Sequence, residues 1–540
     1  MYEVKLIKPQ ISIVHHNEIV VQGFVDENQN KYNSVSDLLN SITKQTKIYC
    51  YLYQPIVRHL ERYAVNNNFA IPKCNAQTYY SGSPKKNTFS AIHLMTSASK
   101  YAAPHTSIVK MWYNGIQILF LDIAKWMDRL NHWVVDAEDH FKLWQLLDHV
   151  EHNIITPQYL PLCEKSKMGK VPKTLASLSR AIIGGKENMY SANNERLKEM
   201  KGAYATGYNW IEEALRRYSK LYYLDVKSMY PFVMMNRNYP DPKRACEVFD
   251  EFIPVDNVKQ LAIYHIDTLV ATLKPQHFPT AFAQKEAQHR MGILDNTSFS
   301  WVCRNPLDGW MTSIDYETLF RDYDVETIVV DKTHLYYAIV PGRELFGNKI
   351  EEIFDLKESS IGVERQAYKL LLNTYSGSIG MSCHDKYRVD SISNPTEMFL
   401  LEQKQSNVRP WDLSAFMTAY ARKYITDLAY EAGYETVKCI STDAVVVGNP
   451  DGLMKYIGEE MGDLSIDKIM HNAMWWRPNC YEYQDEDGKW QGTVSGLPSY
   501  LYKHDKLVYN IPVLQYDPIH HSYYIAYQRF DIEGGEKNEE

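Results

Sequence analysis

Two aspartates follow apolar, β-prone segments that lie far apart in the chain, and together they constrain the fold more than any other feature. Asp225 ends the run LYYLDV at residues 221–226, and a Ser-x-Tyr-Pro turn and the apolar run FVMM follow it. Asp443 lies in a short polar turn between the runs VKCI and AVVV. The first pattern predicts a strand followed by a helix, and the second predicts a β-hairpin with Asp443 near its tip. Taken alone, each aspartate is most often an ordinary strand-end or turn residue.

A cationic helix face lies between these two aspartates in the sequence. Arg365, Lys369 and Asn373 recur every four residues and share one face of a predicted helix, and Lys357 extends the patch upstream. By itself such a stripe is most often a solvated helix face. Positive charges also suit a triphosphate, and two strand-borne carboxylates suit two-metal phosphoryl transfer. No GxxxxGK[ST] segment is present, so a P-loop ATPase is not supported.

Length and composition limit the remaining choices. The 540 residues suggest about three or four folding units. No run of about 18 uncharged apolar residues occurs, which argues against a membrane protein. The eight cysteines form no CxxC pair, so neither a zinc site nor a disulfide framework is indicated and a reducing cytoplasm fits best. The net charge of −8 means that a nucleic-acid enzyme would have to concentrate its basic residues in a groove.

Three segments resemble the motifs of family B DNA polymerases. The segment DVKSMYP at residues 225–231 resembles motif A, DxxSLYP; KLLLNTYSG at 369–377 resembles motif B, KxxxNSxYG; and STDA at 441–444 resembles motif C, DTDS. Their order and spacing resemble the protein-primed branch of the family, found in small tailed phages, adenoviruses and linear plasmids. Upstream, YATG at residues 204–207 resembles that branch's YxGG element.

The resemblance implies a mixed α/β (α+β) fold with a right-hand polymerase after a ribonuclease H-like, exonuclease-like domain. We expect the exonuclease-like domain at residues 1–155 and a linker with the YxGG-like element at 156–210. Palm and fingers would occupy 211–450, with terminal-protein-region-like insertions at about 240–340 and 385–408. The thumb and an acidic tail would occupy 451–540.

The resemblance also implies roles for individual residues. Asp225, Asp443 and the backbone of Val226 would hold two Mg²⁺ ions, for which Mn²⁺ could substitute. The incoming dNTP would contact Lys357, Arg365 and Lys369 through its phosphates, Tyr230 through its sugar and Asn373 at the nascent pair. The primer–template would contact Tyr204, Gly207, Arg477 and Tyr481. The implied partners are DNA primer–template, dNTPs and, as one candidate primer, a terminal protein; the protein would act as a monomer in the cytoplasm of a host or plasmid-bearing cell.

The sequence departs from the family pattern inside the polymerase motifs. Ser441 stands where motif C has its first aspartate, and Ser376 where motif B has a tyrosine; Tyr375, one residue earlier, would point about 100° away on a helix. The family's KxY element, which grips the primer end, has its nearest counterpart at NCY, residues 479–481, where Asn479 replaces the lysine.

The exonuclease motifs depart further. No Asp-x-Glu occurs in residues 2–7, and the second motif corresponds at best to YLYQP at 51–55, which has neither the asparagine nor the aspartate. Asp148 is one candidate for the third motif, but a single carboxylate cannot hold two metal ions. Two hypotheses therefore remain: a DNA polymerase without proofreading, and a degenerate polymerase that serves as a nucleic-acid-binding or protein-binding scaffold.

Overall fold

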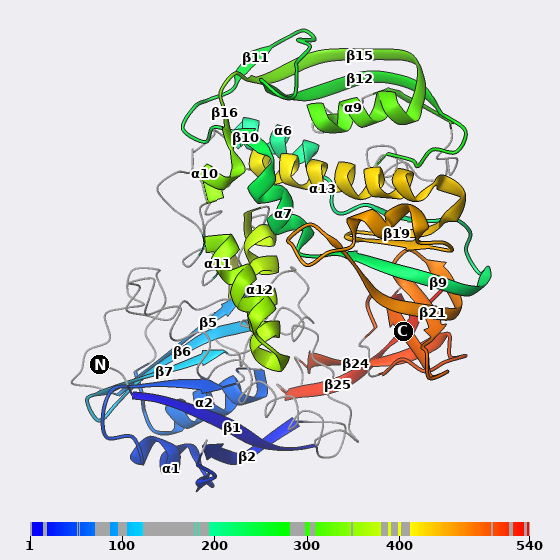
Figure 1. Ribbon diagram of the computed structural model, residues 1–540. Helices are drawn as coiled ribbons and strands as arrows, with labels where there is room; N and C mark the ends of the chain where they lie inside the picture. Colours follow the sequence, from blue (N-terminus) through cyan, green and yellow to red (C-terminus); the bar gives the residue numbers. More distant parts are fainter. Residues whose placement is uncertain are drawn as a thin grey trace.

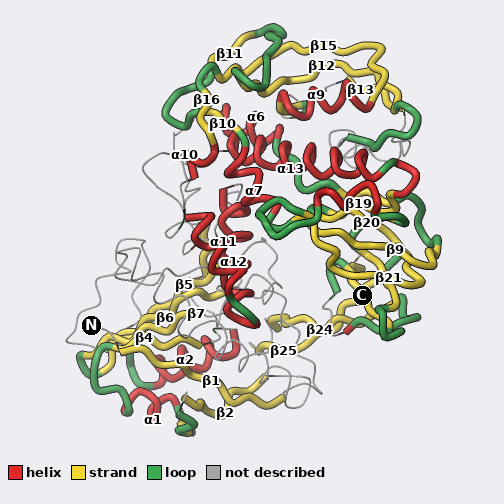
Figure 2. Tube along the Cα trace, in the orientation of Figure 1, coloured by secondary structure: helices red, strands yellow, loops and turns green. Residues whose placement is uncertain are grey.

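The computed structural model describes most of the chain and leaves several segments out. Described are residues 3–13, 19–26, 28–50, 52, 54–70, 87–94, 105–122, 179, 183, 194–280, 298–302, 308–346, 349–379, 387–389, 398–400, 411–497, 501–517, 522–533 and 537–538. Asp148, most of the expected linker and most of the expected second insertion lie outside these residues. Three large sheets carry the architecture, and helices run between them (Figures 1 and 2).

The N-terminal sheet has mixed strand directions. Its order is β3-β2-β1-β4-β7-β6-β5, with β1 parallel to β4 and β4 parallel to β7. The strands are β1 (Glu3–Ile13), β2 (Ile19–Asp26), β3 (Lys31–Tyr32), β4 (Thr46–Cys50), β5 (Thr88–Leu94), β6 (His105–Tyr113) and β7 (Ile116–Asp122). This order, an antiparallel meander joined to parallel strands at β1, agrees with the ribonuclease H-like fold expected here. Glu3 is the only acidic residue of β1.

Two helices accompany this sheet. In α1 (Val35–Asn40) the Ser34 hydroxyl caps the first turn, because it accepts a hydrogen bond from the Asp37 N–H at 3.1 Å. In α2 (Gln54–Asn66) the apolar face is buried, with Ile56 and Leu60 at most 1% exposed.

The second sheet is wholly antiparallel and lies near the middle of the molecule. Its order is β23-β22-β21-β9-β20-β19-β8. The strands are β8 (Asn209–Ile211), β9 (Arg217–Val226), β19 (Val437–Ser441), β20 (Ala444–Val447), β21 (Leu464–Arg477), β22 (Cys480–Gln484) and β23 (Trp490–Val494). The expected strand at residues 221–226 is the end of β9, and the expected hairpin is β19–β20. Asp225 therefore lies on the strand next to the hairpin that carries Asp443.

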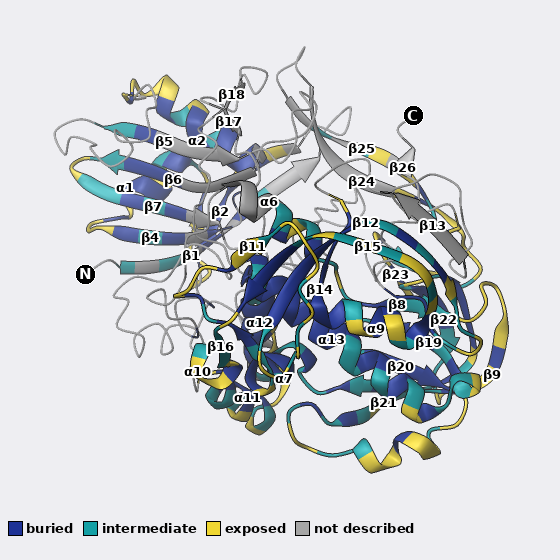
Figure 3. Cartoon of the chain, turned by 90° about the horizontal axis from the view of Figure 1, so that it is seen from above, coloured by how far each residue is buried: buried dark blue, intermediate teal, exposed yellow. Residues whose placement is uncertain are grey.

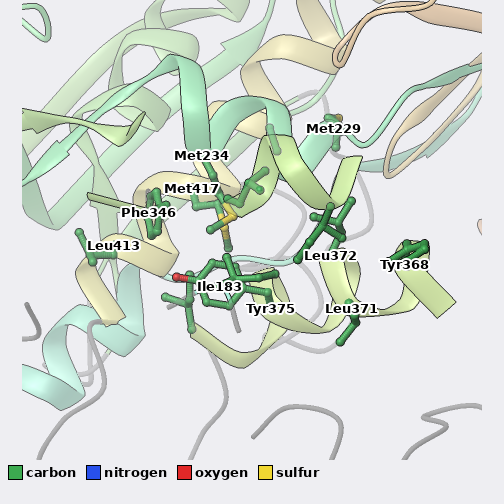
Figure 4. Packing of buried hydrophobic residues seen from close by; sticks show 14 of the residues in the cluster. Ile183, Met229, Met234, Phe346, Tyr368, Leu371, Leu372, Tyr375, Leu413 and Met417 are labelled. Carbon is green, nitrogen blue, oxygen red and sulfur yellow. The ribbon is translucent and has the colours of Figure 1, made fainter. Parts of the chain in front are cut away.

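Helices pack around this sheet and form the main core. They are α6 (Asn194–Ala203), α7 (Met229–Asn236), α10 (Gly342–Phe346), α11 (Lys349–Ser359), α12 (Gly362–Ile379) and α13 (Trp411–Ala432). Most of α13 is buried, and Figure 3 shows it among dark-blue elements. Figure 4 shows Leu371, Leu372 and Tyr375 on the buried side of α12, in the cluster that also holds Phe346. Because this side of α12 packs against protein, the opposite side carries its polar residues.

The third sheet has its own core and lies within the expected first insertion. It consists of β11 (Glu247–Phe249), β15 (Tyr323–Tyr336), β12 (Leu261–Leu273), β13 (Ser298–Val302) and β14 (Trp310–Thr312), with α9 (Ser313–Asp322) against it. Figure 1 places it at the end of the molecule opposite the N-terminal sheet.

Smaller elements complete the described part of the chain. The strand pairs are β10 (Asn238–Pro240) with β16 (Ile339–Pro341), β17 (Tyr387–Val389) with β18 (Met398–Leu400), and β24 (Val508–Asp517) with β25 (Ser522–Asp531) and β26 (Lys537–Asn538). Two short 3₁₀ segments are η7 (Tyr434–Thr436) and η8 (Asp451–Tyr456). Among the described helices, none is long and apolar enough to span a bilayer.

Candidate active site

Backbone pairing brings Asp225 and Asp443 together. In the β9–β20 pair Asp225 is opposite Ala444, and the Val226 N–H donates to the Asp443 carbonyl at 2.8 Å. Ser441 pairs with Ala444, so Thr442 and Asp443 form the tip of the β19–β20 hairpin. Thr442 has φ 55°, the left-handed conformation that tight hairpins of this length require. The hairpin thus holds Asp443 beside the end of β9.

The two carboxylates share an environment that disfavours two unneutralised negative charges. Burial, followed by repulsion from Asp443, raises the pKa of Asp225 to about 7. Burial also raises the pKa of Asp443. The positive charge of Lys369 opposes both shifts. A carboxylate pair with raised pKa values gains stability from any cation that binds between or beside its members, so the donor set fits divalent metal ions.

A third carboxylate near this pair was not expected from the sequence. Asp467 lies at a bulge in β21, between Ile466 and Lys468, where the register to β9 shifts. Its charge raises the pKa values of both Asp225 and Asp443, although its own side chain is 58% exposed. No local motif marks Asp467, because only the pairing of β21 with β9 brings it near the site.

The cations expected at a triphosphate site come from α11 and α12. Arg365, Lys369 and Asn373 all lie on α12, and Lys369 and Asn373 are exposed. The Lys357 side chain on α11 is 6% exposed, and its Nζ donates to the Ser228 Oγ at 2.9 Å. Since Ser228 begins α7 just after Asp225, the Lys357 ammonium lies at the carboxylate end of the site.

One acidic residue in this cationic group was missed by the sequence reasoning. Glu358 accepts hydrogen bonds from both Lys357 and Arg365. Burial alone would raise the pKa of Glu358, but the hydrogen bonds from Arg365 and Lys357 outweigh it and lower that pKa. Its position directly after Lys357 in the sequence was the available signal.

The YxGG-like segment packs against the catalytic hairpin. The Tyr208 carbonyl accepts the Thr442 N–H at 2.7 Å. A Cβ on Gly207 would lie 2.6 Å from the Thr442 Cγ2 and 3.1 Å from the Tyr230 hydroxyl, so only glycine fits there. Tyr204 packs edge-to-face on Trp411, with ring centroids 5.6 Å apart.

Arg422, a further residue that the motif reading missed, holds this segment in place. Its guanidinium donates to the Ala205 carbonyl at 2.7 Å and to the Thr206 carbonyl at 3.1 Å. It also forms two 2.8 Å hydrogen bonds with Asp315 at the start of α9. Arg422 therefore connects α13, the YxGG-like segment and the helix of the third sheet.

The two altered positions of motif B lie in the protein interior. Tyr375 is 2% exposed and contacts Phe346 in the core (Figure 4). This position agrees with the expectation that Tyr375, one residue before the motif position, points about 100° away from it on the helix. Ser376 is 4% exposed, and its hydroxyl donates to the Asn373 carbonyl at 2.9 Å. No aromatic ring from either position is available at the exposed face of α12.

The altered residues of motif C and of the KxY-like element contact one another. The Ser441 Oγ donates to the Asn479 Oδ1 at 3.0 Å. Tyr481 is 6% exposed, and its hydroxyl lies 3.3 Å from the Lys468 Nζ, so a lysine reaches this tyrosine from β21 instead of from position 479. Arg477 donates to the Ile532 carbonyl at 3.1 Å, which ties β21 to the C-terminal strands.

Comparisons with known proteins agree with this architecture. Residues 171–444 match the family model described as DNA polymerase type B, organellar and viral. A probable DNA polymerase of Podospora anserina is 21% identical over 362 residues, which are 67% of this chain and 27% of that protein. The chain thus spans about a quarter of the length of this curated relative.

Solved structures of Phi29 DNA polymerase share the fold. The complex with primer-template DNA matches with a TM-score of 0.70 at 17% identity, covering 98% of this chain and 100% of the other. The ternary complex with primer-template DNA and incoming nucleotides matches with a TM-score of 0.68 at the same identity and coverage. The fold class expected from the sequence, an exonuclease-like domain followed by a polymerase, is confirmed.

Proposed function

The chain belongs to the DNA polymerase type B family of organellar and viral proteins, and from this premise we propose that it is a DNA-directed DNA polymerase. The observation that carries the proposal is that the hairpin β19–β20 holds Asp443 beside Asp225 at the end of β9, where the positive charge of Lys369 acts on both carboxylates. The raised pKa values of Asp225 and Asp443 mean that holding both carboxylates ionised at this site is unfavourable. A scaffold protein has no physical need for such a pair.

In the proposed reaction the primer 3′ oxygen attacks the α-phosphorus of a dNTP. The 3′-hydroxyl loses its proton to solvent as the new phosphorus–oxygen bond forms, the bond between the α-phosphorus and the oxygen that bridges it to the β-phosphorus breaks, and pyrophosphate leaves. Asp225, Asp443 and the Val226 carbonyl would hold two Mg²⁺ or Mn²⁺ ions, which supply activation of the attacking hydroxyl and neutralisation of the phosphates. Binding and orientation of the nucleotide and of the primer–template are the tasks of the protein's own side chains.

Each side chain of the nucleotide site has a proposed task. Lys369, Arg365 and Lys357 balance the charge of the triphosphate, and Lys357 does so from a position fixed by Ser228. Tyr230, in the first turn of α7 with its hydroxyl beside Gly207, closes the space at the sugar and excludes a 2′-hydroxyl. Asn373, exposed on α12, lines the nascent base pair.

Primer and template would meet the segments that flank the carboxylates. Tyr204 and Gly207 position the template strand close to the hairpin. Tyr481 and Arg477 lie at the primer side; the bonds of Arg477 to the C-terminal strands favour a positioning role for it. Because the chain is acidic overall, we expect DNA binding to weaken steeply with salt.

We further propose that the enzyme lacks proofreading and can start from a protein hydroxyl. The single acidic residue of β1 supports the first point, since an exonuclease of this fold needs several carboxylates for its metals. The separate third sheet at residues 247–336 offers a platform for a terminal protein. A labelled single strand incubated with Mg²⁺ or Mn²⁺ should stay intact; 3′→5′ trimming that Asp148→Ala abolishes would contradict the first point.

The test of the main proposal is extension of a labelled primer–template with four dNTPs in Mg²⁺ and separately in Mn²⁺. Asp443→Asn should abolish extension while Asp451→Asn, a matched change in η8, leaves it intact. No extension by the unaltered protein, with primer–template binding retained, would favour the scaffold hypothesis instead. Extension that ignores the template would keep the catalytic site but refute the assignment as a replicase.

A further inference from the structure

Glu358 bridges two of the cations assigned to the triphosphate. Its Oε1 lies 2.7 Å from the Lys357 Nζ, and its Oε2 lies 2.8 Å from the Arg365 Nη1. A second bond joins Oε1 to the Arg365 Nη2 at 3.3 Å. One carboxylate thus pairs with two cations.

The bridge lies at the carboxylate end of the site and not on a remote helix face. The Lys357 Nζ also donates to Ser228, which begins α7 only three residues after Asp225. The Lys357 side chain is 6% exposed, whereas those of Glu358 and Arg365 are 26% and 41% exposed. Glu358 is therefore a more exposed partner of this buried ammonium, and it pairs with it beside Ser228.

We propose that Glu358 is an internal counterion of the triphosphate site, displaced by the incoming nucleotide and restored when pyrophosphate leaves. This inference rests on the proposed function, because it takes Lys357 and Arg365 as triphosphate contacts. It makes Glu358 a determinant of substrate choice: a ligand must bring more negative charge than one carboxylate to replace it.

Either fate of Glu358 on nucleotide binding opposes that binding. If the carboxylate stays, it repels the phosphates across a partly desolvated site. If it moves away, its ion pairs with Lys357 and Arg365 are lost, and even partly exposed pairs of this kind contribute a modest stabilisation. Its removal should therefore tighten the binding of triphosphate and pyrophosphate about five-fold, which corresponds to about 1 kcal/mol.

The experiment compares the unaltered chain with Glu358→Gln and with the control Glu352→Gln. Glu352 lies on the same helix, pairs with Lys349 and loses the same charge when changed. Steady-state primer extension should show KM for dNTP about five-fold lower in E358Q, with the inhibition constant of pyrophosphate lowered by a similar factor. The control should match the unaltered chain, because its charge lies about 9 Å farther along the helix.

A second readout separates failure of this inference from failure of the proposed function. Calorimetric binding of inorganic tripolyphosphate in EDTA needs no catalysis, and E358Q should bind it about five-fold tighter. Unchanged or weaker tripolyphosphate binding and an unchanged or raised KM would overturn the counterion role and show that Glu358 only orients the cations. An unaltered chain that binds tripolyphosphate but extends no primer would refute the polymerase proposal alone. Should E358Q not fold, Glu358→Ala replaces it, since alanine suits a helix.

Discussion

The hydrogen bond between Ser441 and Asn479 leads to a prediction about charge at the active site. The family pattern has an aspartate and a lysine at these positions, and this chain has two neutral residues whose side chains meet at 3.0 Å. The total charge of the two residues is zero both in the family pattern, as Asp and Lys, and in this chain, as Ser441 and Asn479. We therefore expect Asn479→Lys alone to impair metal-dependent activity, and Ser441→Asp added to it to restore activity.

The expected size follows from the position of the pair. Ser441 precedes Asp443 by two residues on the hairpin, and both Ser441 and Asn479 are half-buried. Unit charges about 8 Å apart interact by about 2 kcal/mol at an effective dielectric constant of about 20. An unpaired ammonium at position 479 should therefore raise the metal concentration for half-maximal rate roughly ten- to thirty-fold, allowing for screening by solvent.

The assay is primer extension across a Mg²⁺ titration for the unaltered chain, each single variant and the double variant. Asn479 has φ 61°, so a longer side chain adds backbone strain; Asn479→Gln adds that strain without charge and serves as the control. The double-mutant cycle should yield a favourable coupling of about 1 kcal/mol or more. Additive losses in the cycle, or equal losses in N479K and N479Q, would refute the charge argument.

Three further perturbations test the packing and the electrostatics of the site. Gly207→Ala should lower the extension rate at least about ten-fold, because its Cβ would lie 2.6 Å from the Thr442 side chain. The control Gly448→Ala should leave the rate unchanged, because the atom nearest to its Cβ would be 3.8 Å away. Equal extension rates in the two variants would contradict this argument. In EDTA the free energy of unfolding should fall by about 3 kcal/mol between pH 4 and 8, since the folded pKa of Asp225 is raised to about 7 and the folded state holds the proton longer. Asp225→Asn should remove that fall in urea titrations, and an unchanged pH slope would contradict the assignment. Arg422→Ala should lower the free energy of unfolding in the same assay by about 3–5 kcal/mol, because it leaves the buried Asp315 without its ion-pair partner. Lys423→Ala, which removes a side chain that is 30% exposed, should lower it by under about 1 kcal/mol.

The elements that carry Asp225 and Asp443, the proposed catalytic aspartates, could be predicted because their signals are local. A β-prone run ending in Asp225 and two such runs around a polar turn specify a strand and a hairpin without reference to the rest of the chain. The helical spacing of Arg365, Lys369 and Asn373 is equally local, and α12 presents them as expected. The buried position of Tyr375 also follows from a one-residue offset on a helix.

Contacts between distant strands could not be predicted, because they depend on sheet register. Asp467 comes near Asp225 only because β21 pairs with β9 across a bulge, and Lys468 comes near Tyr481 only because β22 lies on the other side of β21. Arg422 meets the YxGG-like segment only because α13 crosses beneath it. Glu358 is different: it lies beside Lys357 in sequence, but its effect depends on the rotamer that also reaches Arg365.

Departures that look like separate losses in the sequence are coupled in space. Ser441 ends β19 and Asn479 lies in the turn between β21 and β22, yet their side chains meet, so the acid and the lysine absent from these positions would have been neighbours, and their joint absence leaves the local charge unchanged. A cation still reaches Tyr481, supplied by Lys468 from β21. A motif-by-motif count of substitutions therefore overstates the change at the site, because the electrostatic environment of Asp225 and Asp443 depends on the sum of the charges around them and not on which strand supplies those charges.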